Sequence, residues 1–298
     1  MSYNQNEQLT FMAIHAHPDD EVFVTGVTLA RLAQEGVRTI LVTATRGEVG
    51  EVVDPDLDVA GKEAISGKLG EVREEELKVA AEALGVSELR FLDYRDSGMV
   101  GTEDNKNPLA FYNANFDEAV RRVVKLIREF RPQVVTTYEP FGGYGHPDHV
   151  QVHRVSVAAF AAAGEPRLYS ELGLEAWQPQ KLYYTLIPRS WFQQAAAVLR
   201  ERGIDGPWNN PEMETASWGD PDEMLTTRFD GQDFIEQKLT AFRAHKTQIA
   251  PDNFMFVMPE DMRREGLGFE FFFLAQSKLS QSTLPTEGYE EDLFAGLR

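Results

Sequence analysis

Four short apolar runs, each followed at once by a polar cluster, set the fold that this chain can adopt. The runs have the length and composition of buried strands and span residues 11–16, 39–44, 89–92 and 133–138. Helical patterns lie between and after them, at residues 22–35, 62–84, 116–130 and 147–163. Short buried strands that alternate with helices predict a mostly parallel sheet with helices on both faces.

The α/β alternation is regular up to about residue 165 and looser beyond it, where residues 181–187 and 269–273 are further predicted strands. We expect a Rossmann-like catalytic core over residues 1–170 and a smaller C-terminal α/β extension over residues 171–298, packed on the core as one unit. Residues 203–224 are rich in Gly, Pro, Asn, Asp and Trp. They predict one long irregular loop, which could close over a substrate.

The polar clusters are expected to meet at one edge of the sheet. They read HPDDE, RGE, RDSGM and GGYGHPDH, in chain order. In an open parallel sheet, ligands bind outside the carboxyl ends of the strands. The sequence therefore places a candidate site where these four clusters converge.

Two of the clusters share the triplet His-Pro-Asp and lie among most of the histidine in the chain. Five of the six histidines lie in or next to residues 11–22 and 141–150. Imidazole and carboxylate gathered at two loops are typical ligands of zinc or a similar divalent metal. The chain has no cysteine, which excludes thiolate ligands and disulfides.

Three residues are the predicted ligands of one metal ion. His17 and Asp20 lie three apart in a tight loop, close enough to share an ion. His149 supplies the third ligand from the second motif. A fourth position then stays open for water, as catalytic zinc requires.

The neighbouring residues suit hydrolysis of an amide or ester by metal-bound hydroxide. Asp19 is the predicted general base, because adjacent carboxylates tend to point in different directions and one can face the water. His146 could polarise the substrate carbonyl or protonate the leaving amine. We expect Asp148 to orient His146 through its other ring nitrogen.

A plainer interpretation of the same residues is structural. Polar residues in these loops could simply cap helices. His15 falls on a buried strand and is expected to be a core histidine, and His153 is expected to pack or support the site. His245 is left undecided by its sequence surroundings.

The net charge and the hydropathy of the sequence disfavour several classes of binding partner. The formal net charge of −19 disfavours nucleic acid and anionic membranes. No window approaches the roughly 18 apolar residues of a membrane helix, and the polar N-terminus does not read as a signal peptide. We therefore expect a cytoplasmic protein that acts on a small molecule, with homo-oligomerisation left open.

The two motifs also carry a resemblance. With AHPDDE near the N-terminus and GGYGHPDHV in mid-chain, the sequence resembles the LmbE/PIG-L de-N-acetylases. The resemblance covers residues 10–165, including RDSGM, and continues weakly through AHKTQI at 244–249. It implies a zinc enzyme that removes acetyl from an N-acetylglucosamine conjugate, most similar to the branch that deacetylates N-acetylglucosaminyl-inositol in mycothiol biosynthesis.

Residue roles follow from the resemblance by motif position. It implies the same three ligands for one Zn²⁺ per chain, with Fe²⁺ as the alternative metal, and the same general base. It implies the transition-state role for the first histidine of the second motif, supported by the aspartate of that motif. It adds Tyr144 as a mobile polar contact to the reacting group, and as sugar contacts it adds Arg73, Asp96 and Met99.

Two rival functions stay open. The amidase branch of the family, which acts on mycothiol S-conjugates, carries a Lys just after DDE, where this chain has the Lys-free residues 22–25. That absence favours a deacetylase, although apolar residues 22–24 leave an amidase or deacetylase of a thiol conjugate or glycosylated natural product as the alternative. A non-catalytic sugar- or metal-binding protein is a rival of another class. The intact Asp19 and His146 oppose it, because binding alone requires neither.

Overall fold

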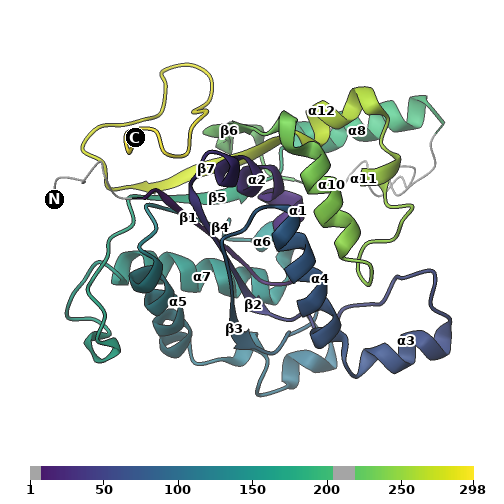
Figure 1. Ribbon diagram of the computed structural model, residues 1–298, viewed down its shortest axis with the longest axis horizontal. Helices are drawn as coiled ribbons and strands as arrows, with labels where there is room; N and C mark the ends of the chain where they lie inside the picture. Colours follow the sequence, from purple (N-terminus) through teal and green to yellow (C-terminus); the bar gives the residue numbers. More distant parts are fainter. Residues whose placement is uncertain (1–7, 204–218) are drawn as a thin grey trace.

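One seven-stranded sheet organises the described part of the chain, residues 8–203 and 219–298 of a computed structural model (Figure 1). The strand order is β3-β2-β1-β4-β5-β7-β6. The first five strands run parallel, and β7 is antiparallel to both neighbours. This confirms the predicted mostly parallel α/β fold. The strands are β1 Thr10–His15, β2 Arg38–Thr45, β3 Glu88–Tyr94, β4 Val134–Tyr138, β5 Lys181–Leu186, β6 Thr227–Asp230 and β7 Phe269–Ser277.

Helices cover both faces of the sheet. Alternate residues of β1 point to opposite faces, so Phe11 belongs to one hydrophobic cluster and Met12 to the other. The first cluster packs under α2 Gly26–Gln34, α4 Leu69–Ala83 and α10 Ile235–Ala244. The second packs under α5 Phe116–Phe130 and α7 Pro147–Ala162, which lie side by side in Figure 1.

Two predicted helices are each broken in two. The helix expected over residues 22–35 divides at Thr25 into α1 Asp20–Val24 and α2. The Thr25 hydroxyl donates to the Glu21 carbonyl (3.1 Å) and lies 2.9 Å from His15 Nε2, so its side chain ties the break to β1. The helix expected over 62–84 becomes α3 Val59–Ser66 and α4, separated at Gly67.

The C-terminal half extends the same sheet. The predicted strands at 181–187 and 269–273 are β5 and β7, whereas β6 was not predicted. Residues 204–218 of the predicted loop lie outside the described residues. Of the rest of that loop, Asp220 forms a bridge with Pro188, and a short turn follows.

The end of the chain returns to the sheet through a buried ion pair. Glu290 accepts hydrogen bonds from Lys181 Nζ (2.7 Å), the Tyr183 hydroxyl (2.5 Å) and the Thr227 hydroxyl (3.1 Å). Lys181 is completely buried. Because a buried charge requires a partner, this carboxylate fastens the C-terminal segment to β5 and β6.

Further helices complete the described part. None of the helices there is long and apolar enough to cross a bilayer. The α-helices are α6 Gly142–Gly145, α8 Arg189–Glu201, α11 Phe254–Val257 and α12 Glu260–Leu267. The 3-10 helices are η1 Glu103–Lys106, η2 Phe111–Asn113, η3 Ser170–Leu172, η5 Asp222–Met224 and η6 Gln232–Phe234.

Candidate metal centre

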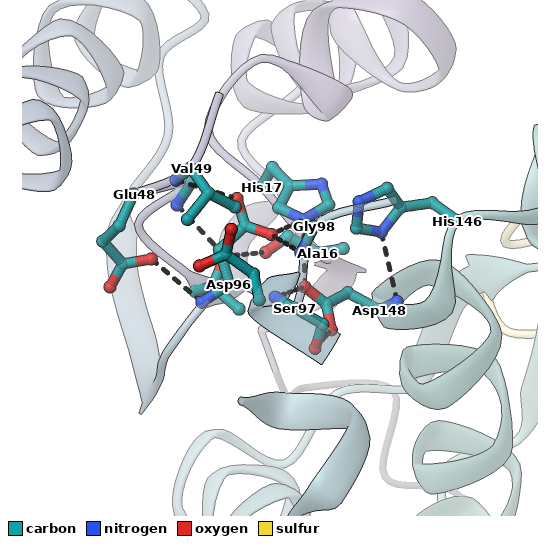
Figure 2. A network of polar contacts seen from close by, with 12 residues as sticks. Ala16, His17, Glu48, Val49, Asp96, Ser97, Gly98, His146 and Asp148 are labelled. Carbon is teal, nitrogen blue, oxygen red and sulfur yellow. Dashed lines mark hydrogen bonds and ion pairs between the residues drawn. The ribbon is translucent and has the colours of Figure 1, made fainter. Parts of the chain in front are cut away.

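Polar side chains converge at the carboxyl ends of β1, β3 and β4. His17 and Asp96 follow the ends of β1 and β3, and His149 lies in the first turn of α7, after β4. In Figure 2 the side chains of His17, His146, Asp96 and Asp148 gather in one place. Segments far apart in the sequence therefore meet at one edge of the sheet.

The HPDDE loop holds Asp20 in a fixed orientation. Asp20 Oδ2 accepts hydrogen bonds from the His17 backbone N–H and the Tyr138 hydroxyl, both at 2.7 Å. The Tyr138 oxygen also accepts the Ala16 N–H at 2.8 Å. Because Tyr138 ends β4, this side chain ties the first motif to the strand that leads to the second.

Three side chains have donor atoms at the spacing of metal ligands, with one Asp20 oxygen facing each of the two imidazoles. His17 Nδ1 lies 3.2 Å from His149 Nε2 and 3.5 Å from Asp20 Oδ2, and His149 Nε2 lies 3.4 Å from Asp20 Oδ1. Tetrahedral zinc with ligands at its usual bond lengths separates them by about 3.3 Å. His146 also comes near, since ring nitrogens of His17, His146 and His149 lie within 4.8 Å of one another. The spacing therefore fits a metal on His17, Asp20 and His149.

The opposite ring nitrogen of His17 faces a carboxylate. His17 Nε2 lies 3.2 Å from Asp148 Oδ2, and the same carboxylate accepts the Ser97 N–H (2.9 Å) and the Ser97 hydroxyl. A histidine that ligates metal through one nitrogen commonly donates to a carboxylate through the other. The Asp148 carboxylate was expected to contact His146, but it contacts His17 and Ser97 instead, and it is the Asp148 backbone N–H that donates to His146 Nδ1.

Three carboxylates, those of Asp20, Asp96 and Asp148, lie around the His17 imidazole. Burial alone would lower the pKa of His17, but Asp96, Asp148 and Asp20 outweigh burial and raise that pKa well above its usual value. Burial would raise the pKa of Asp20, but the hydrogen bond and the charge of His17 hold that pKa well below its usual value. Burial lowers the pKa of His149 to about 3, so this imidazole is neutral. An ionised carboxylate and a neutral imidazole suit a divalent cation, which would take the place of the His17 proton.

Asp19 lies beside this group in an unusual conformation. Its φ of 106° lies in the left-handed region that favours glycine. Its side chain is one-fifth exposed (20%), and Oδ1 lies 3.3 Å from Arg73 Nη2. Burial raises the pKa of Asp19 to about 6, with Arg73 opposing the shift and Asp20 adding to it. A carboxylate with a pKa near neutrality is suited to accept a proton.

The three predicted sugar contacts differ in their surroundings. Arg73 is buried, and its guanidinium donates to the Gly47 and Pro18 carbonyls at 2.8 and 2.5 Å, so it holds the loop that carries Asp19. Asp96 is buried, accepts the Gly98 N–H (2.8 Å) and lies 3.6 Å from His17 Nε2. Met99 is 46% exposed. Contact of these residues with a sugar remains a prediction.

A cavity of about 370 Å³ opens onto Asp19, Asp20, Tyr144 and His149. Tyr144 is half exposed, and its ring centre lies 4.9 Å from that of His149. Glycines with positive φ flank it, at 72° for Gly143 and 84° for Gly145. The cavity is large enough to hold a small sugar beside the metal donors.

Sequence reasoning missed several residues that hold the site in place. Tyr138 is the last residue of a predicted strand, and that position was the signal in the sequence that could have placed it at the site. Ser97 lies inside RDSGM, but nothing in the sequence shows that it binds Asp148. Glu21 was treated only as the last letter of HPDDE, although it is fully buried and bonded to His245 at 2.7 Å. His153 was not missed: it was expected to pack or support the site, and its Nδ1 lies 2.8 Å from the Tyr138 carbonyl.

Known proteins resemble this chain over nearly its whole length. Residues 12–160 match the family model "PIG-L: GlcNAc-PI de-N-acetylase". A 1D-myo-inositol 2-acetamido-2-deoxy-alpha-D-glucopyranoside deacetylase of Geodermatophilus obscurus is 42% identical over 291 residues, covering 96% of this chain and 97% of that protein. The deacetylase of the same name from Thermobifida fusca is 43% identical over 289 residues, covering 95% of this chain and 98% of that protein.

A solved structure shares the fold. The N,N'-diacetylchitobiose deacetylase of Pyrococcus horikoshii superimposes with a TM-score of 0.61 at 21% identity, covering 93% of this chain and 87% of that chain. At this identity the likeness supports the fold alone.

Proposed function

This chain belongs to the PIG-L family of GlcNAc-PI de-N-acetylases, and we propose on that basis that it releases acetate from an N-acetylglucosaminyl-inositol. It is a metal-dependent deacetylase. The observation that carries the substrate is the identity of about 42% to deacetylases of that conjugate over nearly the full length of both chains. We further propose that it acts in the cytoplasm.

The metal would be held by His17 Nδ1, Asp20 and His149 Nε2, with Asp148 fixing the orientation of His17. Zn²⁺ is the proposed ion, and Fe²⁺ suits the same nitrogen and oxygen donors. When bound, such a cation acts as a Lewis acid and lowers the pKa of water toward neutrality.

Asp19 is the proposed general base. Arg73 engages its Oδ1, so Oδ2 is the oxygen free to take a proton from a water in the cavity. The raised pKa of Asp19 makes its carboxylate a stronger base than an ordinary aspartate while it still ionises near neutral pH.

His146 is the proposed group that stabilises charge on the acetyl oxygen. Its Nδ1 accepts the Asp148 backbone N–H at 3.2 Å, so the proton of the neutral ring is on Nε2 (Figure 2). Burial, followed by the charge of His17, lowers the pKa of His146 and favours that neutral form. An Nε2–H donor aimed at a carbonyl stabilises the negative charge that develops on its oxygen.

The remaining roles concern the substrate. We propose that Tyr144 lies over the reacting amide from the cavity wall, where flanking glycines leave its backbone free to adjust. The proposed contacts to the sugar are Asp96, Met99 and Arg73. Arg73 also lies against Asp19, so it could act on the general base instead of the sugar.

The test is acetate release from N-acetylglucosaminyl-inositol by the metal-loaded protein. Asp19→Asn is the variant that tests the general base, because it keeps the shape of the side chain and removes its basicity. We expect turnover in the natural chain, loss on chelation and loss in the variant. A metal-replete protein that releases no acetate from any acyl-amino sugar would refute the proposal. Faster hydrolysis of a thiol conjugate would favour the rival substrate.

A further inference from the structure

We infer that the buried Glu21–His245 pair is a positioning device for Asp19. His245 Nε2 lies 2.7 Å from Glu21 Oε1, and both side chains are completely buried. The other carboxylate oxygen of Glu21 accepts the backbone N–H of Asp19 at 3.0 Å. Each oxygen of Glu21 thus has one partner, and the chain of contacts runs from His245 to the backbone of the proposed base.

Asp19 needs such support because its backbone is strained. A non-glycine residue at a φ of 106° costs energy, and it persists only when its surroundings hold it. The Asp19 carbonyl accepts the Val22 N–H at 3.1 Å, and Arg73 engages the carboxylate. Glu21 completes the set by fixing the amide, so carboxylate, carbonyl and amide are each held.

His245 is itself fastened to the helix that carries Arg73. It follows the last turn of α10, which packs on α4. The next residues anchor it, since the Thr247 N–H and hydroxyl bind the Glu76 carboxylate on α4 at 2.9 and 2.7 Å. Arg73 lies one turn before Glu76 on the same helix. Arg73 and the Glu21–His245 pair, which both support Asp19, are therefore attached to the same helix.

This role accounts for His245 in the AHKTQI segment at residues 244–249, a histidine whose role the sequence left undecided. The segment lies outside residues 12–160, which match the family model. A buried, hydrogen-bonded carboxylate–imidazole pair is rarely more stabilising than well-packed apolar side chains of similar size. The contact of Glu21 with the Asp19 amide supplies a reason to keep the pair. The second half of the chain thus contributes to the proposed base.

The test compares variants that keep or remove the donor at residue 245, and its kinetic part rests on the proposed function. His245→Gln retains an N–H near the place of Nε2, whereas His245→Leu removes it. Thr247→Val is the matched control, because it removes one side-chain contact of the same segment to α4 but keeps the backbone N–H bond to Glu76 that anchors the segment, and it does not touch Glu21. Metal content is measured in every variant, so that loss of metal is recognised.

For His245→Leu we expect kcat for acetate release to fall about 10- to 100-fold with little change in KM, because the base is misplaced while the substrate is still bound. His245→Gln should recover most of kcat, and Thr247→Val should keep it. Hydrogen–deuterium exchange supplies a readout without substrate. The Asp19 amide should exchange faster in His245→Leu than in Thr247→Val.

The possible results distinguish failure of the positioning role from failure of the proposed function. A folded His245→Leu variant with native kcat and native exchange at Asp19 overturns the inference, as does an equal loss of kcat in Thr247→Val. A natural chain without acetate release refutes the proposed function instead, and the exchange experiment still tests the positioning. If His245→Leu does not fold, the double variant Glu21→Leu/His245→Leu replaces it, because it leaves no unpaired buried charge.

Discussion

Replacing Asp19 by glycine is expected to give a more stable protein than replacing it by alanine. Inside a helix or strand the order is the reverse. Glycine loses more backbone freedom on folding, so a protein with glycine there is less stable than one with alanine by about 0.5–1 kcal/mol. At a φ of 106°, a side chain strains the backbone by about 1–3 kcal/mol. At the middle of both ranges, Asp19→Gly is more stable than Asp19→Ala by about 1 kcal/mol.

The comparison isolates the backbone. Both variants lose the carboxylate and its contact with Arg73, and both keep the amide that Glu21 binds, so these effects cancel. Urea unfolding of the two metal-free variants, with a chelator present, measures the difference. Neither variant should release acetate. An alanine variant as stable as the glycine variant, or more stable, would show that Asp19 is not strained and would remove the need for support from Glu21.

Three further predictions concern the site and the core. Asp148→Asn should weaken metal affinity about 10- to 100-fold by loosening His17, measured by competition with a chelator. Glu290→Gln should lower the free energy of unfolding by about 3 kcal/mol, because Lys181 keeps an unpaired buried charge, and urea unfolding measures it. Burial raises the pKa of Asp220 from 3.8 to about 6, so the folded state holds this proton more tightly and stability falls as pH rises through that range. Asp220→Asn should lose less stability than the natural chain between about pH 4 and about pH 7, and an equal loss would contradict the assignment.

Local sequence patterns predicted the core strands and the approach of the two motifs. Four apolar runs were enough for β1 to β4. The strands β1, β2 and β4 are buried and mostly apolar, and the edge strand β3, although only partly buried, still carries a short apolar run. The breaks at Thr25 and Gly67 were missed, since the first depends on a side-chain contact with His15 across the fold. The strand β6 was missed because it is short and gains its stability by pairing with β7, which no local pattern encodes.

At the site, residue types were predictable and their partners were not. The grouping of His17, Asp20 and His149 could be expected because their motifs follow neighbouring parallel strands. The partner of Asp148 could not, because the choice between His146 and His17 depends on side-chain directions set by packing. The bond between Glu21 and His245 joins residues 224 positions apart, and no periodicity links them.

The place of β4 in the sheet sets a limit on how the enzyme can be shortened. It pairs with β1 on one side and β5 on the other, and all five of its residues are buried. The family-matched segment ends at residue 160, before β5 begins at Lys181. A chain truncated between them would leave the backbone N–H and C=O groups of β4 that face β5 without partners, and such open edges recruit other chains into aggregates. Truncation to the family-matched half would therefore yield insoluble material rather than a minimal enzyme.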